Sequence, residues 1–252
     1  MQFRILWDHP ERCPYRDNEV ARLPLRVPLR PLRPADFDQM LAEGDRRTGR
    51  MLYRTACPSC TACHPLRVPV QRHVATRSQK RVWKKNEDLE LRISKPALTR
   101  DRLRMYNRHK LERGLSSSGE PLTAESYRAW LIDTCVDTRE FQYILEGKLI
   151  GVTIVDLGSR AASSVYHYFD PDYESRSLGV YSALRELEWC KQQGLDWYYF
   201  GFYVQDCAHL RYKANYYPHQ RCSGGVWTEY SAPEDVGSVV ELAAPVPVVV
   251  PP

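Results

Sequence analysis

The sequence predicts an α+β protein with a cysteine-containing, basic N-terminal part. Three observations support this prediction. Cysteines at positions 57, 60 and 63 recur at two-residue intervals, shortly before the basic tract RSQKRVWKKN. From about residue 96, helix-like and strand-like patterns follow in the order helix, helix, three strands, loop, helix and strand. A chain of 252 residues, 43% of them hydrophobic, is long enough to bury a full core.

These patterns divide the chain into three parts. Residues 1–95 carry the cysteines and the basic tract, and residues 96–231 carry the alternating elements. The remaining residues, 232–252, end in AAPVPVVVPP, and this low-complexity composition predicts a disordered tail.

The first 56 residues are predicted to be largely irregular. Five prolines lie between Pro10 and Pro31, and the segment PLRVPLRPLRP is expected to be an extended connector, because proline interrupts regular strand pairing. A short helix is expected to begin at Pro34, with Asp36 and Asp38 near its positively charged end.

The later elements are predicted from hydrophobic periodicity and from cap residues. A helix at about 99–113 ends at Gly114, Thr123 caps the next helix, and Gly194 ends a third. A hairpin turn is expected at Gly147-Lys148. The predicted strands lie in HPLRVPVQRHV, FQYILE, LIGVTIVDL, SSVYHYF and LDWYYFGFYV.

Charge is unevenly distributed along the chain. The net charge is only +5, but the stretch from Leu66 to Arg113 holds 15 Lys and Arg against 5 Asp and Glu. Such a block is either a solvated face or a surface for a polyanionic partner. The sequence has no long apolar run and no signal-peptide pattern, so we expect a cytoplasmic protein without a membrane span.

Eight cysteines without a secretion signal are expected to be reduced thiols or metal ligands. Metal ligands usually come in fours, and Cys13 is the distant candidate to join Cys57, Cys60 and Cys63. Thiolates suit a structural Zn²⁺ or an iron–sulfur cluster, and the sequence does not separate the two. The alternative is that the thiols only pack.

Two further segments suit nucleic-acid chemistry. The junction from Ser175 to Gly179 opens a helix, so its free backbone N–H groups, with Arg176, could bind a phosphate; the alternative is an ordinary serine cap. Downstream, aromatic rings alternate with Arg and Lys up to Pro218, which suits base stacking and phosphate contact. Tyr199 and Phe200 are better explained as core residues. Lys213 does not suit a core position and stays a candidate for binding.

Five segments carry a family resemblance: HPERCPY, YRTACPSCTACHPLRVPV, TRSQKRVWKKNEDL, YHYFDPDYESRSLGVYSALRELEWC and FYVQDCAHLRYKANYYPHQ. With them the chain resembles the aminoacyl-tRNA–protein transferases, which comprise the arginyltransferases of eukaryotes and the leucyltransferases of bacteria. The resemblance implies a GCN5-acetyltransferase-like catalytic domain at residues 96–231. It also implies transfer of an amino acid from charged tRNA to a protein N-terminus that begins with an acidic residue, which marks that protein for N-degron degradation.

One departure bears on the cargo. Eukaryotic members have a C-x-x-C pair near the N-terminus, whereas this chain keeps only Cys13 of that pair, as bacterial members tend to. This favours leucine over arginine as the transferred residue. An apolar pocket would suit leucine, and a carboxylate would suit arginine.

Roles are expected from charge and from the resemblance. The aminoacyl ester is already activated, so transfer requires no cofactor, and the amine of the protein substrate attacks it directly. Asp170, Lys213 and Tyr212 are the expected catalytic residues, although Asp170 could equally cap its loop. The expected ligands of the acidic side chain are Arg77, Ser78, Gln79, Arg81 and Arg211. The expected tRNA contacts are Lys84, Lys85, Arg176, Ser177, Leu178, Gly179 and Tyr203.

Three other functions remain compatible with the sequence. A CoA-dependent N-acyltransferase would need a glycine-rich pyrophosphate turn, and SRSLGVYS has a single glycine. A non-catalytic, metal-containing tRNA-binding protein would explain the basic tract and the cysteines, but not the second half of the chain. An inactive relative of the transferases is the third.

Overall fold

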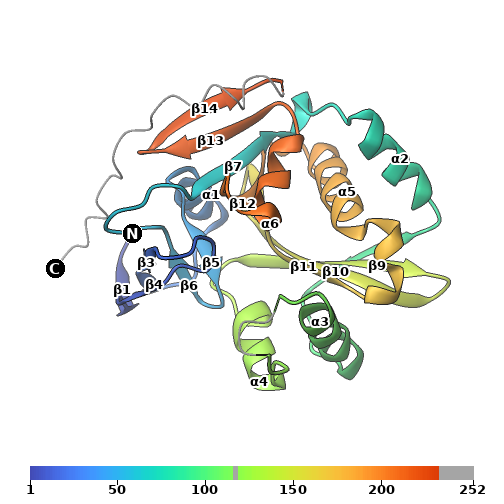
Figure 1. Ribbon diagram of the computed structural model, residues 1–252, viewed down its shortest axis with the longest axis horizontal. Coiled ribbons are helices and arrows are strands. Elements are labelled where there is room, and N and C mark those ends of the chain that lie inside the picture. Colours follow the sequence, from blue (N-terminus) through green and yellow to red (C-terminus); the bar gives the residue numbers. More distant parts are fainter. Residues whose placement is uncertain (116–118, 233–252) are drawn as a thin grey trace.

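An eight-stranded mixed sheet forms the centre of the computed structural model, which describes residues 1–115 and 119–232 (Figure 1). The strand order is β14-β13-β7-β12-β11-β10-β9-β8. These strands are β7 His64–Pro69, β8 Glu90–Ser94, β9 Asp137–Leu145, β10 Lys148–Leu157, β11 Ala161–Phe169, β12 Trp197–Tyr203, β13 His219–Ser223 and β14 Val226–Tyr230.

Helices cover both faces of this sheet (Figure 1). On one face, Leu184 and Leu187 of α5 join a core with Phe141 of β9, and Trp83 of α2 packs against that core. On the other face, α3 and α4 cover β10 and β11. The helices are α1 Pro34–Ala42, α2 Arg77–Lys85, α3 Arg100–Glu112, α4 Ala124–Tyr127, α5 Leu178–Gln192 and α6 Ala208–Arg211, with short turns η1 Val70–Arg72, η2 Arg128–Ile132, η3 Pro171–Arg176 and η4 Tyr212–Asn215.

The N-terminal segment is more regular than its prolines predict. Its strands form a sheet of order β1-β4-β6-β5 and a separate β2–β3 pair. The expected connector therefore contains a paired strand, and the prediction of an irregular segment was wrong. The prolines are tolerated because Pro24 precedes β4 and Pro28 is its last residue. The strands are β1 Phe3–Trp7, β2 Pro10–Arg12, β3 Val20–Arg22, β4 Leu25–Pro28, β5 Arg46–Thr48 and β6 Met51–Tyr53.

The predicted elements from residue 96 onward are confirmed. Thr99 and Thr123 cap α3 and α4, and Gly114 and Gly194 follow α3 and α5 with positive φ. The hairpin turn lies at Glu146-Gly147, one residue earlier than predicted. The α+β class and the element order implied by the GCN5-type resemblance are thereby confirmed. The predicted tail beyond Ala232 and the first half of the predicted loop at 116–121 lie outside the described residues.

The central sheet runs across the predicted boundary at residue 95. β7 and β8 precede that boundary, yet β7 pairs with β12 and β8 pairs with β9. The basic tract between them forms α2, which begins at a capping box of Thr76 and Gln79. The two parts of the chain therefore share one sheet, and the basic helix lies on its surface.

The parallel pair β11–β12 opens into a wedge. The two strands are paired only over Ala161–Ser163 and Trp197–Tyr199. Beyond that point β12 has a register shift against β7, next to Gly201, whose φ is +92°. A bulge bends a strand away from its neighbour. Here it accompanies the separation of β12 from β11, and the guanidinium of Arg46 occupies the base of the opening.

We predict that Gly201→Ala is more destabilising than Gly194→Ala. Both glycines have positive φ, so both substitutions strain the backbone, by about 1–2 kcal/mol. Only at Gly201 would the new Cβ press on a side chain, since it would lie 3.0 Å from Nη2 of Arg46, whereas nothing lies within 4 Å at Gly194. We expect Gly201→Ala to lower the free energy of unfolding by about 2–4 kcal/mol in urea titrations. Equal effects of the two variants would contradict this.

Candidate active site

A cavity of about 740 Å³ fills the wedge between β11 and β12. Its walls are the diverging ends of the two strands, the first turn of α5, and the segment of α6 and η4. This volume is typical of sites that hold small molecules and cofactors. Its polar groups come from segments far apart in the sequence, so only the folded chain brings them together.

Arg46 forms the floor of the cavity. Its side chain donates hydrogen bonds to Oγ of Ser163 at 2.7 Å and to the carbonyl oxygen of Ser164 at 2.5 Å. The guanidinium also lies against Gly201, with Nη2 nearest to it. Arg46 is only 8% exposed, and burial lowers its pKa. It thus bridges the two strands at the point where they part.

The residues on either side of Arg46 fix its direction. Asp45 is buried and forms ion pairs with Arg26 and, at 2.6 Å, with Arg54. Arg47 is buried and pairs with Asp156 of β10 at 2.5 Å. Breaking a buried pair of this kind leaves an uncompensated charge, so these contacts hold β5 in a fixed position against the main sheet.

Lys213 is the second buried cation of the cavity. Its Nζ donates to the carbonyl oxygen of Phe202 at 2.8 Å, and the residue is 8% exposed. Burial, together with the positive charge of Arg46, lowers the pKa of Lys213 to about 7. Among the described residues neither Arg46 nor Lys213 forms an ion pair with a carboxylate. The cavity therefore offers an anionic ligand the guanidinium of Arg46 and the amine of Lys213, which a bound carboxylate would hold in its charged form.

A buried carboxyl group, that of Glu186 on α5, lies behind the cavity wall. It accepts a very short hydrogen bond from the hydroxyl of Tyr198 and a second, at 3.3 Å, from the hydroxyl of Tyr143. The hydroxyls of Thr153 and Ser164 also bond to it. Burial raises the pKa of Glu186 to about 7, against the opposing effect of these hydrogen bonds.

Two neutral histidines line the same cavity. Burial lowers the pKa of His109 to about 4 and that of His167 to about 3. Nδ1 of His167 is 2.9 Å from Oγ1 of Thr153, while its Nε2 is buried without a hydrogen-bond partner among the described residues. A polar atom of this kind is expected to meet a ligand or water.

Five of the residues predicted from the sequence meet in this cavity: Ser177, Leu178, Gly179, Tyr212 and Lys213. The first three form the N-terminal turn of α5, where backbone N–H groups have no intrahelical acceptor and favour an anion. The other two begin the η4 turn on the opposite side. The sequence does not indicate this proximity, because 33 residues separate the two turns.

The residues predicted to bind the acidic side chain lie on α2 instead. Arg77, Ser78 and Arg81 are exposed, whereas Gln79 is buried and donates to the carbonyl oxygen of Asn215 at 3.3 Å. Ser78 and Gln79 line a second hollow, of about 490 Å³, which shares two lining residues with the main cavity. The α2 residues are therefore next to the cavity but not in it.

Several predicted tRNA contacts have partners within the protein. Arg176 forms a bidentate pair with Asp88, with both distances 2.9 Å, and Lys85 donates to the carbonyl oxygen of Ser175 at 2.6 Å. These contacts join the end of α2 to the turn before α5. Lys84 is exposed and lines a hollow of about 290 Å³ between α2 and α5.

Two more predicted residues lie outside the cavity lining. Tyr203 is buried, stacks with His64 and lies 3.8 Å below the guanidinium of Arg221. Arg211 is exposed at the end of α6. Their positions agree with a packing role for Tyr203 and leave Arg211 at the surface beside the cavity.

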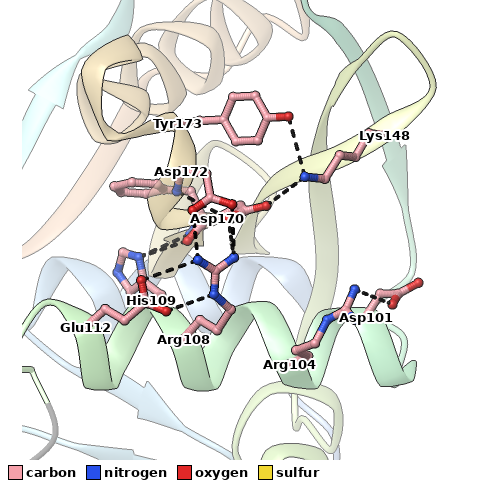
Figure 2. Close-up of polar contacts among 10 residues, drawn as sticks. Asp101, Arg104, Arg108, His109, Glu112, Lys148, Asp170, Asp172 and Tyr173 are labelled. Carbon is pink, nitrogen blue, oxygen red and sulfur yellow. Dashed lines mark hydrogen bonds and ion pairs between the residues drawn. The ribbon is translucent and has the colours of Figure 1, made fainter.

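Asp170 lies in an ion-pair cluster outside the cavity lining. Figure 2 shows its carboxylate between Arg108, whose Nη1 is 2.8 Å away, and Lys148, whose Nζ is 3.0 Å away. The same carboxylate accepts a hydrogen bond from the backbone of Asp172 and caps the η3 turn. Both oxygens are therefore occupied, one by Arg108 of α3 and the other by Lys148 of β10, and the catalytic role of Asp170 stays a prediction.

The four predicted metal ligands approach one another. Burial, together with the charges of Cys57, Cys13 and Cys60, raises the pKa of Cys63 to about 12. However, no three His, Cys, Asp or Glu side chains are grouped as metal ligands within residues 1–115 and 119–232. Nη1 of Arg16 also donates to Sγ of Cys60 at 3.4 Å. The metal site therefore stays a prediction.

Sequence reasoning missed Arg46 and Glu186. Arg46 lies in the charged run DRR, where nothing distinguishes it from the two neighbours that form structural ion pairs. Glu186 lies on α5 between the buried residues Leu184 and Leu187. In the sequence it is the one acidic residue within the apolar face of this helix. That position is the one feature that could have identified it, because a buried acid needs a specific environment.

Comparison with known proteins identifies the family. Residues 11–81 match the model described as arginine-tRNA-protein transferase, N terminus, and residues 101–223 match the C terminus of the same description. The chain belongs to the aminoacyl-tRNA–protein transferase family. It is therefore an aminoacyltransferase, and aminoacyl-tRNA is its donor substrate.

The curated relatives are bacterial. A protein of Aeromonas hydrophila named aspartate/glutamate leucyltransferase is 34% identical over 86% of this chain and 90% of its own length. Proteins of the same name from Hahella chejuensis and Acinetobacter baumannii are 30% and 31% identical, over 84% and 91% of this chain and 90% and 86% of their own lengths.

Likeness to solved structures is weak. FemX aligns over 77% of this transferase and 79% of its own chain, with 9% identity and a TM-score of 0.44. A tandem GNAT protein from the clavulanic acid biosynthesis pathway aligns over 88% and 62%, with 13% identity and a TM-score of 0.40. The assignment of the chain rests on the sequence matches. Within its described residues, no helix is both long and apolar enough to span a membrane.

We predict a pH-dependent stability difference between Glu186→Gln and the parent transferase. The native pKa of Glu186 is raised to about 7 from 4.5, so the unfolded chain ionises first as pH increases. The parent should lose stability relative to the variant between these two values, by about 3 kcal/mol in total. Urea unfolding at several pH values measures this difference. Glu188→Gln on the same helix is the control, because it makes the same substitution at a residue that is not fully buried. A stability difference for Glu186→Gln that does not change with pH would contradict the raised pKa of Glu186.

Proposed function

We propose that this transferase moves leucine from leucyl-tRNA to the N-terminal amine of proteins that begin with Asp or Glu. The observation that carries the proposal is the pair of buried cations, Arg46 and Lys213, at the floor of a cavity whose rim is the N-terminus of α5. The bacterial relatives support it, since they are named aspartate/glutamate leucyltransferases.

The two cations suit the acidic side chain of the acceptor. Their present hydrogen-bond partners are neutral: a serine hydroxyl and the carbonyl oxygens of Ser164 and Phe202. Burying a charge without a counter-charge is unfavourable, so a carboxylate that enters the cavity would compensate both groups. The planar guanidinium of Arg46 suits a carboxylate especially well. An acceptor that begins with Ala would leave the two cations uncompensated.

The apolar part of the cavity favours leucine as cargo. Leu178, Val180, Phe200 and Leu210 line it. An arginine side chain would need a carboxylate partner, and among the described lining residues the one carboxylate is that of Glu174, which is exposed at the edge. The buried Glu186 is screened by hydroxyl groups. A leucine side chain would gain the larger apolar contact.

The tRNA would approach over the first turn of α5 and the exposed basic side chains of α2. Free N–H groups at a helix N-terminus bind phosphate well. On α2, the exposed side chains of Arg77, Lys80, Arg81 and Lys84 have no carboxylate partner in the described part of the chain. This basic face suits the backbone of the acceptor stem. We thus reassign Arg77 and Arg81 from the acidic side chain to phosphate.

The chemistry needs positioning more than activation. The ester is already activated, and the α-amine of the acceptor has a pKa of about 7.7–8.0, so an appreciable fraction is neutral near pH 7. Holding the amine and the ester carbonyl in contact supplies much of the rate enhancement. Charged tRNA is supplied in the cytoplasm, where the product would enter an N-degron pathway.

We predict transfer from leucyl-tRNA to peptides that begin with Asp or Glu, and none to peptides that begin with Ala. The measurement follows label from tRNA charged with radioactive leucine or, separately, arginine. Parallel reactions with labelled acetyl-CoA test the acyltransferase alternative. Transfer from arginyl-tRNA alone would replace leucine by arginine in the proposal. No transfer from either tRNA, or transfer from acetyl-CoA, would reject it.

Lys213→Met tests the acidic-residue site directly. Losing one charged hydrogen bond of about 1.5–3 kcal/mol should raise KM for the Asp peptide roughly 10–150-fold. Affinity for leucyl-tRNA should be unchanged. Lys95→Met is the matched control, because Lys95 is exposed and pairs with Asp137 away from the cavity. If Lys213→Met instead weakens leucyl-tRNA binding and leaves the KM for the peptide unchanged, Lys213 serves the donor and not the acceptor.

A further inference from the structure

The buried carboxyl of Glu186 has no place in the transfer site described so far. It is 1% exposed, and the largest influences on its pKa are burial and four hydroxyl groups, with no Lys, Arg or His among them. A structural acid on a buried helix face would normally pair with a cation or be replaced by an apolar residue. Glu186 instead meets four hydroxyl groups, and this arrangement suggests a group that holds a proton.

Two of these hydroxyl-bearing residues also line the cavity. Tyr198 on β12 donates to Glu186 through its hydroxyl, and Ser164 on β11 bonds to both Tyr198 and Glu186. Ser164 is the first residue of β11 beyond the last pair, whereas Tyr198 is still paired with Ala162. A continuous hydrogen-bonded path therefore runs from the cavity wall to the buried carboxyl.

We propose that Glu186 accepts, through the Tyr198 hydroxyl, the proton that the acceptor amine releases when it attacks the aminoacyl ester. This inference rests on the proposed transfer reaction and adds a catalytic residue, Tyr198, and a proton-holding residue, Glu186, to it. Ser164 orients the Tyr198 hydroxyl.

The proposed step balances in atoms and charge. The amine nitrogen forms a bond to the carbonyl carbon, and the π-electron pair moves to the carbonyl oxygen. The nitrogen, now positively charged, gives one proton to the Tyr198 oxygen while the Tyr198 proton passes to the Glu186 carboxylate. When the intermediate collapses, the bond from carbon to the ribose oxygen breaks, and that oxygen takes the proton back along the same path. One ester becomes one amide and one free hydroxyl.

The acid–base properties of the pair agree with this geometry. A pKa of about 7 allows Glu186 to accept a proton and return it near neutral pH. Burial raises the pKa of Tyr198 well above its usual value, so Tyr198 conducts the proton and does not store charge. The titratable groups that face Glu186 from the surrounding elements are Tyr143, Tyr198, Cys190, Tyr212 and Tyr216.

The experiment measures single-turnover transfer from leucyl-tRNA to an Asp peptide between about pH 5.5 and 8. Glu186→Gln and Tyr198→Phe should each slow transfer by roughly 10²–10⁴-fold at the upper end. Dividing the parent rate by the Glu186→Gln rate cancels the titration of the acceptor amine. This ratio should rise with pH and level off above about pH 7.

Tyr127→Phe is the matched control. It also removes a buried tyrosine hydroxyl, which is paired with Tyr168 on the opposite face of the sheet, and it should leave rate and pH profile unchanged. Tyr143→Phe removes a donor to Glu186 that does not line the cavity, so it should move the inflection to higher pH. Urea unfolding and leucyl-tRNA binding of each variant show that it is folded.

The outcomes separate this inference from the proposed function. If the parent transferase transfers no leucine, the proposed function fails. If the parent is active but folded Glu186→Gln keeps its rate, or the ratio is independent of pH, the proton path is overturned. If Glu186→Gln does not fold, Tyr198→Phe decides, and a parent-like rate and pH profile in that variant would overturn the path equally.

Discussion

The separation of β11 from β12 around Arg46 is the constraint on which the site depends. A parallel pair buried in the middle of a sheet would normally stay hydrogen-bonded along its length, because unpaired backbone groups are unfavourable. Here Arg46 occupies the opening, donates to the backbone of Ser164 and lies against Gly201. The side chain thereby supplies a donor to the β11 edge at the separation and at the same time places a positive charge at the floor of the cavity.

This arrangement explains why so many charges are buried in the N-terminal segment. Asp45 and Arg47 fix β5 on both sides of Arg46, and Arg47 reaches Asp156 in the main sheet. These ion pairs are weak evidence for stability, since apolar residues of the same volume could serve as well. What they provide is a single orientation for the residue between them. The N-terminal segment and the sheet thus act as one unit in forming the site.

The sequence predicted the elements after residue 96 well, because their periodicity and caps are local properties. Gly114, Thr123 and Gly194 end or begin helices through their own backbone and side-chain properties, independently of tertiary contacts. It predicted the site only partly. Local chemistry and resemblance predicted roles for Tyr212 and the α5 turn, and both line the cavity, whereas Arg46 could not be separated from its charged neighbours. Tertiary contacts decide which of these charged residues pairs within the protein and which is left to bind a ligand. A local sequence pattern carries no information about those contacts.

The central claim is that the acidic side chain of the acceptor binds in the wedge, at Arg46 and Lys213. The most direct test is a crystal structure of the protein with an Asp-initiated peptide and a non-hydrolysable leucyl-adenosine amide. The account predicts the Asp carboxylate within hydrogen-bond distance of both cations, with the leucyl group against the apolar wall. A carboxylate bound instead by Arg77 or Arg81 on α2 would contradict it.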